Sequence, residues 1–316
     1  AVSVYGLGYQ QHFLGKHSLG WYGCLYALFL GSLFLLPLTN HAFFFLFVWE
    51  IMSLASYFLV IYERNPESER AAFLYFLMTH LGTAFIMLAL FLAYSQPGSL
   101  SFDDWRTASF GITPWFKGLI FLSALIGFGT KAGIIPFHIW LPEAYPATPS
   151  PAAALMSGIM SKLSFFMLVR FFFDFFPGAA MEWGLGIIVL GGVSAILGIL
   201  YALAEKDIKR LLAYSSIENM GIMFLGLGAA IVFFALGAQS FAIFDLAAAL
   251  YHALNHAIFK SLLFLGAGTV VSAAGTRNVD AYGGLIRALP YTAGFFLVGS
   301  LAISAFPPFN GFASEW

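Results

Sequence analysis

The sequence is poor in charge and nearly free of cysteine. Only 9% of its 316 residues are Asp, Glu, Lys or Arg, whereas about 25% is typical of a soluble domain. The single cysteine, Cys24, excludes a disulfide framework and a cysteine-ligated cluster within the chain. A formal net charge of −1 provides no basic footprint for nucleic acid. A phosphate-binding glycine loop, a Cys-x-x-Cys pair and a nucleophile–base–acid set are also missing, so we expect no redox or hydrolytic chemistry in the chain itself.

The chain is rich in long apolar runs. Hydrophobic residues make up 60% of it, and runs of about 20 residues, enough to cross a bilayer as a helix, recur along its length. The pattern predicts an all-α fold, a polytopic membrane helical bundle with about nine transmembrane helices. The predicted helices cover residues 21–38, 41–62, 70–95, 115–135, 152–174, 183–204, 210–236, 241–272 and 290–306. Residues 1–20, which are polar and rich in glycine, are expected to form an extramembrane lead-in.

Apart from Lys131, Lys162 and Lys260, which lie within helices, the Lys and Arg residues are unevenly divided between the two sides of this arrangement. Those on the first side are Lys16, Arg64, Arg70, Lys206, Lys209, Arg210, Arg277 and Arg287. Those on the second side are Arg106, Lys117 and Arg170. By the positive-inside rule the first side is cytoplasmic, and the lead-in lies in the cytoplasm.

Prolines interrupt two of the predicted helices. The fourth helix runs into PFHIWLP at 136–142, and the ninth runs into PPFNG at 307–311. Breaks at the fourth and ninth positions predict two units of five helices, and because five is odd, the second unit is inverted in the membrane. Residues 21–174 would form the first repeat and residues 183–316 an incomplete second one. The chain begins without Met and stops inside an expected element, so we interpret it as part of a longer polypeptide.

Three ionisable residues of the first predicted unit are candidates for function. Glu50 is midway along the second helix, Lys131 is near the end of the fourth, and Lys162 is in the fifth. Ionisable side chains at bilayer depth are functional candidates by default. Moving a carboxylate towards or away from a buried lysine would load or unload its proton. The alternatives are a protonated structural Glu50 and static ion pairs for the two lysines.

A row of titratable residues follows one face of the eighth predicted helix. His252, His256 and Lys260 are spaced i, i+4 and i+8, so they share a face and follow each other in steps of about 6 Å. That spacing suits proton hopping through intervening water. Haem or metal ligation by the two histidines is the rival hypothesis, which we disfavour because both lie on one helix and leave the opposite face of a haem without a ligand.

Two carboxylates are candidates in the second predicted unit. Glu218 lies in the second helix of that unit, the position equivalent to Glu50, and a capping or interfacial role is the alternative for it. Glu315 follows the break in the ninth helix and corresponds by repeat symmetry to Lys131.

Three further residues have weaker claims. Glu143 and His138 lie in the proline-rich segment, where gating and structural roles are both open. Asp245 precedes the histidines in the eighth helix and is either the end of the row or an interfacial residue.

These segments resemble a known family, the antiporter-like subunits of respiratory complex I, membrane-bound nickel–iron hydrogenases and multisubunit sodium/proton antiporters. The matching motifs are WE at 49–50, TKAGIIPFHIWLPEAYPATPSPAAALMSGIMSK at 130–162, EKDIKRLLAYSSIENMG at 205–221, NHAIFKSLLFLGAG at 255–268 and PPFNGFASEW at 307–316. The resemblance implies two inverted five-helix repeats. It further implies a proton path made of the Glu50–Lys131 pair, the connecting Lys162, the central axis of His252, His256 and Lys260, and the terminal Glu315.

The chain departs from the family pattern at two places. Complex I members typically read LPDAH where this chain reads LPEAY at 141–145, and they often carry His where Asn219 stands. Tyr145 replaces the usual His, which leaves open whether the loop relays protons at that position. The LPEA, SSIENMG and GFASEW segments are most similar to the large membrane subunit of formate hydrogenlyase or hydrogenase-4.

The resemblance implies a non-redox, ion-translocating subunit of an oxidoreductase complex in a prokaryotic cell membrane. It implies no cofactor in this chain, with iron–sulfur clusters and a nickel–iron site in partner subunits of a peripheral redox arm. Other membrane subunits are the remaining expected partners. A subunit of a sodium/proton antiporter, complex I proper, and a membrane anchor with vestigial charges remain alternatives.

Overall fold

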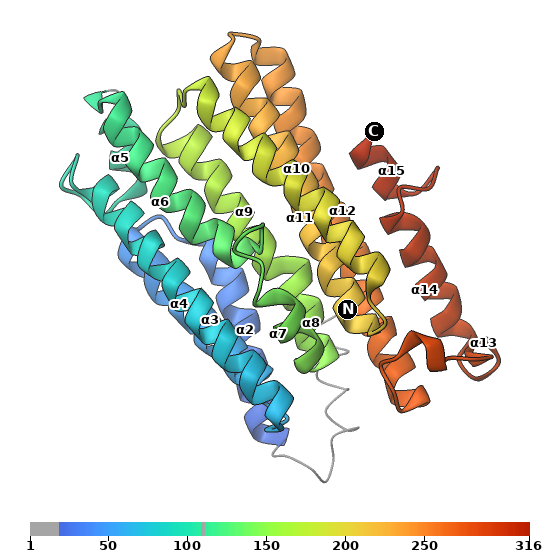
Figure 1. Ribbon diagram of the computed structural model, residues 1–316. Helices are drawn as coiled ribbons and strands as arrows, with labels where there is room; N and C mark the ends of the chain where they lie inside the picture. Colours follow the sequence, from blue (N-terminus) through green and yellow to red (C-terminus); the bar gives the residue numbers. More distant parts are fainter. Residues whose placement is uncertain (1–18, 109–110) are drawn as a thin grey trace.

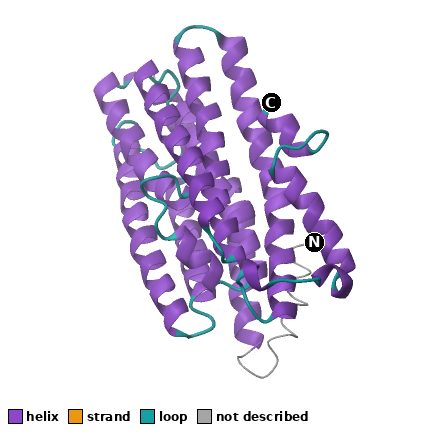
Figure 2. Cartoon of the chain, turned by 45° about the vertical axis from the view of Figure 1, so that its right-hand side comes forward, coloured by secondary structure: helices purple, strands orange, loops and turns teal. Residues whose placement is uncertain are grey.

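The computed structural model describes residues 19–108 and 111–316, which form an elongated bundle of helices (Figure 1). Most of the predicted lead-in, with Lys16, lies outside the described residues. The described part contains no strand, only isolated bridges between His41 and Ser101 and between Asp207 and Asn278 (Figure 2). The all-α class predicted from the apolar runs is therefore confirmed.

The helices follow one another along the bundle with short connections. In the first part of the chain they are α2 (Leu19–Leu35), η2 (Leu36–Leu38), α3 (Ala42–Val60), α4 (Pro66–Tyr94), α5 (Phe102–Ala108), α6 (Pro114–Ala132), α7 (Leu141–Ala147), α8 (Ser150–Leu155), η4 (Met156–Met160), α9 (Ser161–Val169) and η5 (Arg170–Phe175). In the second part they are α10 (Met181–Ala204), α11 (Ile208–Ala235), α12 (Gln239–Ala274), η6 (Val279–Ala281), α13 (Leu285–Ala288), α14 (Pro290–Ile303) and α15 (Asn310–Glu315).

Seven helices among the described residues are long and apolar enough to cross a membrane. They cover Gly20–Leu38, Ala42–Val60, Pro66–Tyr94, Ser150–Phe175, Met181–Ala204, Ile208–Ala235 and Gln239–Ala274. Helices α6 and α14 fall where the fourth and ninth crossings are predicted. Nine crossings and the inverted repeats remain predictions.

Local sequence signals explain the helix boundaries. Helix α4 begins at Pro66, because Asn65 and Ser68 form a reciprocal capping box around it. Helix α11 begins at Ile208, because the Asp207 carboxylate accepts hydrogen bonds from the first free backbone N–H groups. Both starts precede the predicted ones because capping residues are polar and lie outside the apolar run.

The two predicted helix breaks are present. Helix α6 ends at Ala132 and is capped by Gly133, whose φ of +84° is in the left-handed region. A Cβ at Gly133 would lie 2.5 Å from a methyl carbon of Leu141. The chain resumes as α7 and then as a continuous helix from Ser150 to Phe175 that contains the π-turns η4 and η5. The second break separates α14 from α15, with Ala305 at a φ of +49°.

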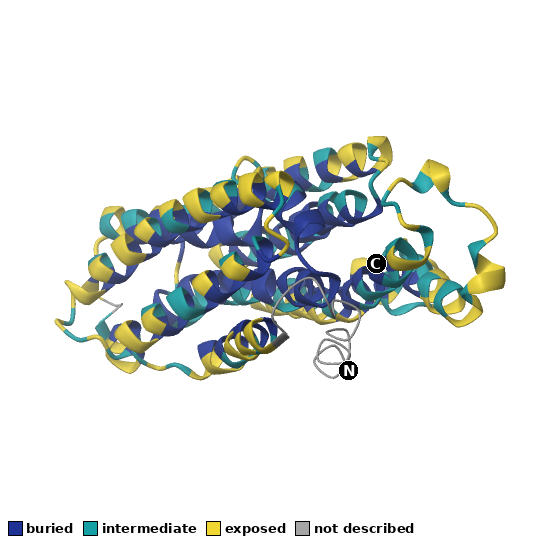
Figure 3. Ribbon diagram, turned by 90° about the horizontal axis from the view of Figure 1, so that it is seen from below, coloured by how far each residue is buried: buried dark blue, intermediate teal, exposed yellow. Residues whose placement is uncertain are grey.

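Burial separates the bundle into a packed interior and an apolar outer surface. Seen from below, buried residues line the spaces between the helices while exposed residues face outward (Figure 3). Many exposed side chains are large and apolar, including Phe43, Phe47, Phe73, Phe91, Ile196, Leu203, Phe244 and Phe295. An apolar exterior around a helical bundle is the surface that lipid requires.

Candidate functional site

Lys131 is buried where three helices meet. It is the penultimate residue of α6 and its side chain is 2% exposed. Its ammonium donates hydrogen bonds to Ser53 Oγ of α3 at 3.0 Å and to the Tyr75 hydroxyl of α4 at 2.8 Å. The ammonium also lies 4.8 Å from the centre of the Tyr75 ring. Its direct partners are therefore neutral.

Glu50 contacts a histidine rather than Lys131. One carboxylate oxygen is 3.7 Å from Nε2 of His80 on α4, and the two side chains are 35% and 37% exposed. The other oxygen is buried without a hydrogen-bond partner. The charge of Glu50 still acts on Lys131, but the structure does not bring the two groups of the predicted pair within ion-pair distance.

Lys162 is held by the π-turn η4. It is 8% exposed, and its ammonium donates to the carbonyl oxygen of Ser157 at 2.6 Å and to Ser161 Oγ at 3.2 Å. A π-turn displaces carbonyls from the regular helical ladder, which makes one available to a side chain. Ser157 Oγ also lies 2.8 Å from Ser216 Oγ of α11, so this turn joins the two parts of the bundle.

The three residues of the predicted row lie on one buried face of α12. His252, His256 and Lys260 are 1%, 0% and 0% exposed, and the two imidazole centroids are 6.3 Å apart. His252 contacts Asn219 Oδ1 at 3.2 Å and Ser314 Oγ at 3.0 Å. Neither ring nitrogen of His256 has a hydrogen-bond partner. The row is therefore continuous in space but not in hydrogen bonds.

Lys260 is connected through Ser215 to a cavity of about 650 Å³. Its ammonium donates a short hydrogen bond to Ser215 Oγ on α11, and Ser215 lines the cavity together with Glu218 and Glu315. Glu218 lies well inside α11, whose N-cap is Asp207, so a capping role for Glu218 is ruled out. The cavity thus gathers both carboxylate candidates of the second predicted unit.

Helix packing places these carboxylates. Gly198 of α10 lets α11 approach so closely that a Cβ there would lie 2.6 Å from the backbone nitrogen of Glu218. Glu315 is exposed at the end of α15, while the preceding Ser314 points inward to His252. Asn219 donates a short hydrogen bond to Glu218, so the histidine row and the cavity share one polar link.

The three weaker candidates differ in their contacts. Glu143 forms an ion pair with Arg210 at 3.3 Å. His138 Nδ1, in the connection between α6 and α7, and Asp245 Oδ2, near the start of α12, are buried without a hydrogen-bond partner. None of the three hydrogen-bonds, within the described ranges, to a residue of the lysine and histidine row.

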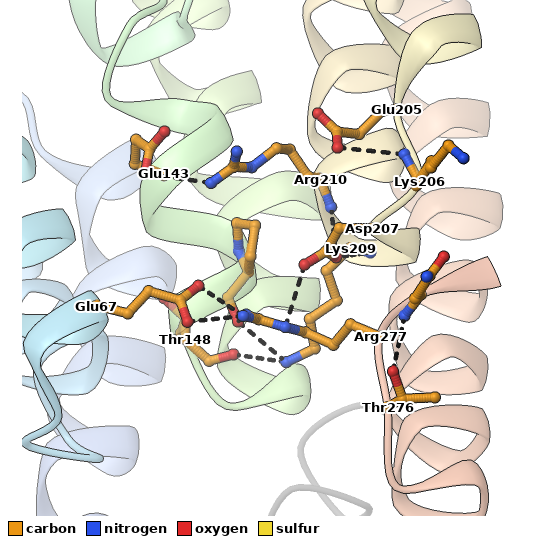
Figure 4. Close-up of polar contacts among 12 residues, drawn as sticks. Glu67, Glu143, Thr148, Glu205, Lys206, Asp207, Lys209, Arg210, Thr276 and Arg277 are labelled. Atoms are coloured by element: carbon orange, nitrogen blue, oxygen red, sulfur yellow. Dashed lines mark hydrogen bonds and ion pairs between the residues drawn. The ribbon is translucent and has the colours of Figure 1, made fainter. Parts of the chain in front are cut away.

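A cluster of charges closes one end of the bundle. Arg277, after α12, binds both oxygens of Glu67 on α4 at 2.7 Å and lies 3.1 Å from Asp207 (Figure 4). We call Glu67, Asp207 and Arg277 the ionic cluster. Burial alone would lower the pKa of Arg277, but the hydrogen bonds and charges of the two carboxylates outweigh it and raise that pKa.

Lys209 extends this cluster towards the broken helix. It is 7% exposed, and its ammonium donates to the carbonyls of Thr148 at 3.0 Å and of Pro146 at 3.5 Å (Figure 4). Arg277 donates to the same Pro146 carbonyl at 3.3 Å. The connection between α7 and α8 is therefore fixed by cations from α11 and from the segment after α12.

Several polar groups at the site could not be assigned from the sequence. His80 could have been selected from the sequence, because a histidine within a membrane helix is a functional candidate. Ser53 could also have been selected, because it follows Glu50 by three residues on the same helical face. Nothing in the sequence distinguishes Tyr75 and Ser215, since residues with hydroxyl groups are common in membrane helices. Within 19–108 and 111–316, no group of three or more His, Cys, Asp or Glu residues is placed to hold a metal ion.

A helical membrane bundle with discontinuous helices and buried ionisable side chains is the architecture of ion-transporting membrane proteins. The chain belongs to the family described as NADH:quinone oxidoreductase/Mrp antiporter, TM, whose sequence profile matches residues 39–316. This membership confirms the resemblance inferred from the motifs. The family's transmembrane character and the seven apolar helices confirm a multi-pass membrane protein, and the bacterial relatives described next agree with the predicted prokaryotic cell membrane.

Three similar proteins refine this placement. Hydrogenase-4 component B of Escherichia coli is 44% identical over 99% of this chain and 47% of its own length. Formate hydrogenlyase subunit 3 of the same organism is 36% identical over the whole chain and 50% of its own length. The Mrp complex of Dietzia sp. DQ12-45-1b contains a chain with a TM-score of 0.84 and 28% identity, over 99% of this chain and 33% of that one. The chain spans about half the length of the curated relatives it matches.

Proposed function

We propose that this chain is the proton-conducting part of an antiporter-like membrane subunit in a membrane-bound nickel–iron hydrogenase or formate hydrogenlyase-type assembly. Redox chemistry would take place in a peripheral arm of partner subunits, which would hold the iron–sulfur clusters and the nickel–iron site. This chain would be a non-redox subunit that moves protons in response. The similarity to hydrogenase-4 component B and formate hydrogenlyase subunit 3 supports this choice of assembly.

One observation carries the proposal: three buried lysines have no carboxylate partner. Lys131, Lys162 and Lys260 are each 8% exposed or less, and within the described part of the chain none forms an ion pair. Burial disfavours the charged form of a lysine, and no counter-ion opposes that effect by direct contact. Such a lysine can give up a proton without breaking a salt bridge, which is what a proton carrier needs.

The proposed path runs along the bundle. A change at Glu50 would alter the field at Lys131, whose proton passes to Lys162 and then to the row of His252, His256 and Lys260. This route is supported by the position of Lys162, whose charge interacts with that of Lys260. The exit would be the cavity lined by Ser215, Glu218 and Glu315, because Lys260 donates directly to Ser215.

The test is Lys131→Met in the complete protein within its intact membrane complex. Methionine keeps much of the side-chain volume but cannot carry a proton. We expect redox activity to persist while proton translocation is abolished, as measured by dye quenching in inverted membrane vesicles. Arg106→Met, which changes a charge outside the path, is the matched control and should translocate normally. Unimpaired translocation by Lys131→Met would refute the proposal.

A multisubunit sodium/proton antiporter is the second candidate, because the Mrp complex chain shares the fold at 28% identity. In that case carboxylates at the cavity would serve as sodium ligands. Sodium dependence separates the two functions: the proposed hydrogenase-type subunit should translocate protons at the same rate with sodium or with potassium as the only alkali cation, and an antiporter should require sodium.

A further inference from the structure

An apolar groove of about 540 Å³ runs along the outside of the bundle between α6 and α10. These two helices belong to different predicted units, so the groove follows the seam between the units. The apolar part of its lining is Leu125 of α6 with Trp183, Gly186, Ile187, Val189 and Leu190 of α10. Gly186 leaves the groove open, because a Cβ there would meet nothing within 4 Å. A groove of this kind on a membrane protein has room for an acyl chain.

Trp183 joins the two helices at one end of the groove. A Cβ at Gly118 of α6 would lie 3.5 Å from the indole, and the indole packs edge to face on Phe121 at a centroid distance of 5.9 Å. Its N–H donates no hydrogen bond to any residue that the structure describes. An indole with its ring packed on apolar surface and its N–H free for another partner is typical of tryptophan at a membrane interface.

Two opposite charges flank this contact. Lys117 directly precedes Gly118 near the start of α6, and Glu182 directly precedes Trp183 in the first turn of α10 and lines the groove. Lys117 donates to the carbonyl oxygen of Pro177 at 3.1 Å, and Glu182 is exposed. Neither forms an ion pair within residues 19–108 and 111–316. One end of the apolar groove therefore offers a cation, an anion and an indole donor.

We propose that this groove binds one phospholipid with an ethanolamine headgroup. An acyl chain lies along Leu125, Gly186 and Leu190, and the headgroup lies at the charged end. The phosphate accepts a hydrogen bond from the Trp183 indole and is attracted by the Lys117 ammonium, while the lipid ammonium donates to the Glu182 carboxylate.

The charges select this headgroup over the other common ones. An anionic headgroup without an amine suits Lys117 but leaves the Glu182 carboxylate without a counter-ion. A choline headgroup carries the positive charge but has no N–H group to donate. The bound lipid fills the seam between the two units, and its binding does not depend on which ion the chain transports.

The test is photo-crosslinking of the complete protein within its membrane complex. The complex is reconstituted into phosphatidylcholine vesicles that contain a phosphatidylethanolamine with a diazirine in one acyl chain. Mass spectrometry of the peptides should find the label concentrated on Leu125 and on residues 186–190. Gly186→Leu fills the groove and should reduce this labelling several-fold. Gly31→Leu, at an equally open position of α2, is the matched control and should leave it unchanged.

Two further variants test the headgroup. Glu182→Gln removes the charge at nearly the same size. The preference of the groove for phosphatidylethanolamine over phosphatidylglycerol with the same diazirine chain should then fall by about three- to fivefold. Trp183→Phe keeps an aromatic ring but removes the N–H donor, so labelling by both lipids should fall.

Three results would overturn the proposal. Equal labelling of the wild type by the two headgroups, or unchanged labelling in Gly186→Leu, would mean that bulk lipid only passes over the groove. A groove without label while the outer face of α2 is labelled would show that a protein segment covers it. All of these readouts are independent of proton translocation, so they stand or fall separately from the proposed function.

Discussion

Cations at the end of the bundle and cations in its interior have different partners. At the end where the ionic cluster lies, the partly or largely exposed Arg277, Arg210 and Lys206 each contact a carboxylate. The buried Lys209 at that end contacts only carbonyl oxygens, as a cation of the interior does. In the interior, Lys131 and Lys260 contact hydroxyl oxygens, and Lys162 contacts a hydroxyl and a carbonyl. The same side-chain chemistry is therefore used in two ways within one molecule.

The difference in partners follows from how each environment affects the protonation of the cationic side chain. A partly exposed ion pair can hold two elements together because water already stabilises both charges. A direct ion pair in the interior would hold the lysine in its charged form and fix its proton in place. Neutral oxygen partners orient the ammonium without holding the lysine in its charged form. We therefore interpret the ionic cluster as structural and the interior lysines as the mobile part of the site.

Placing a carboxylate next to an interior lysine is the strongest way to break this distinction. In Ser215→Asp, the new carboxylate would stand beside Lys260. Two unit charges 4 Å apart attract by about 4 kcal/mol at an effective dielectric constant of about 20. Because about 1.4 kcal/mol corresponds to a factor of ten, proton release from Lys260 should slow by roughly two to three orders of magnitude. Translocation in vesicles should be nearly lost.

Ser215→Ala is the control for this experiment, since it removes the acceptor without adding a charge. We expect it to reduce translocation only a few-fold. If Ser215→Asp translocates as fast as Ser215→Ala, the proton on Lys260 is not part of the path, and interior and surface cations do not differ as argued.

Burial of the lysines could be predicted from the sequence, but their partners could not. Lys131, Lys162 and Lys260 interrupt apolar runs, so any helix built from those runs carries them into the bilayer. Glycine and proline at the ends of the runs similarly mark the helix breaks. Both features are local, and local patterns suffice for them.

The partners arise from contacts between segments far apart in the chain. Lys131 meets Tyr75 across 56 positions and Lys260 meets Ser215 across 45. Helix rotation and register decide which hydroxyl faces the lysine, and a single sequence does not specify either. Glu50 illustrates the consequence, since its carboxylate contacts His80 and not the lysine that the family resemblance suggests.

Removing the central cation of the ionic cluster should affect stability and not transport. Arg277→Met would remove the cation that contacts both Glu67 and Asp207, and would remove the bond to the Pro146 carbonyl. For a partly exposed network we expect a loss of about 1–2 kcal/mol. The melting temperature of the solubilised complex should fall, while translocation per folded complex should stay near that of the wild type.

The double variant Arg277→Met with Glu67→Leu sharpens this result. If the pair acts as a unit, the double variant should be less destabilised than the sum of the two single variants, by about 1 kcal/mol. Strict additivity would show that the bidentate contact contributes nothing beyond its packing. A large loss of transport in Arg277→Met at full stability would place the ionic cluster on the proton path.

The smallest effect is expected at the most exposed ion pair. Lys206 and Asp280 approach to 2.5 Å, but their side chains are 71% and 56% exposed, so water screens the attraction. Lys206→Gln should change stability by less than about 0.5 kcal/mol and leave translocation unchanged. The two loops stay joined in this variant, because the backbone nitrogen of Val279 donates to the Lys206 carbonyl at 2.9 Å and that of Ile208 donates to the Arg277 carbonyl at 3.0 Å. If Lys206→Gln lowered the melting temperature as much as Arg277→Met, exposure would not govern the value of these ion pairs, and the contrast between the two environments would need another physical cause.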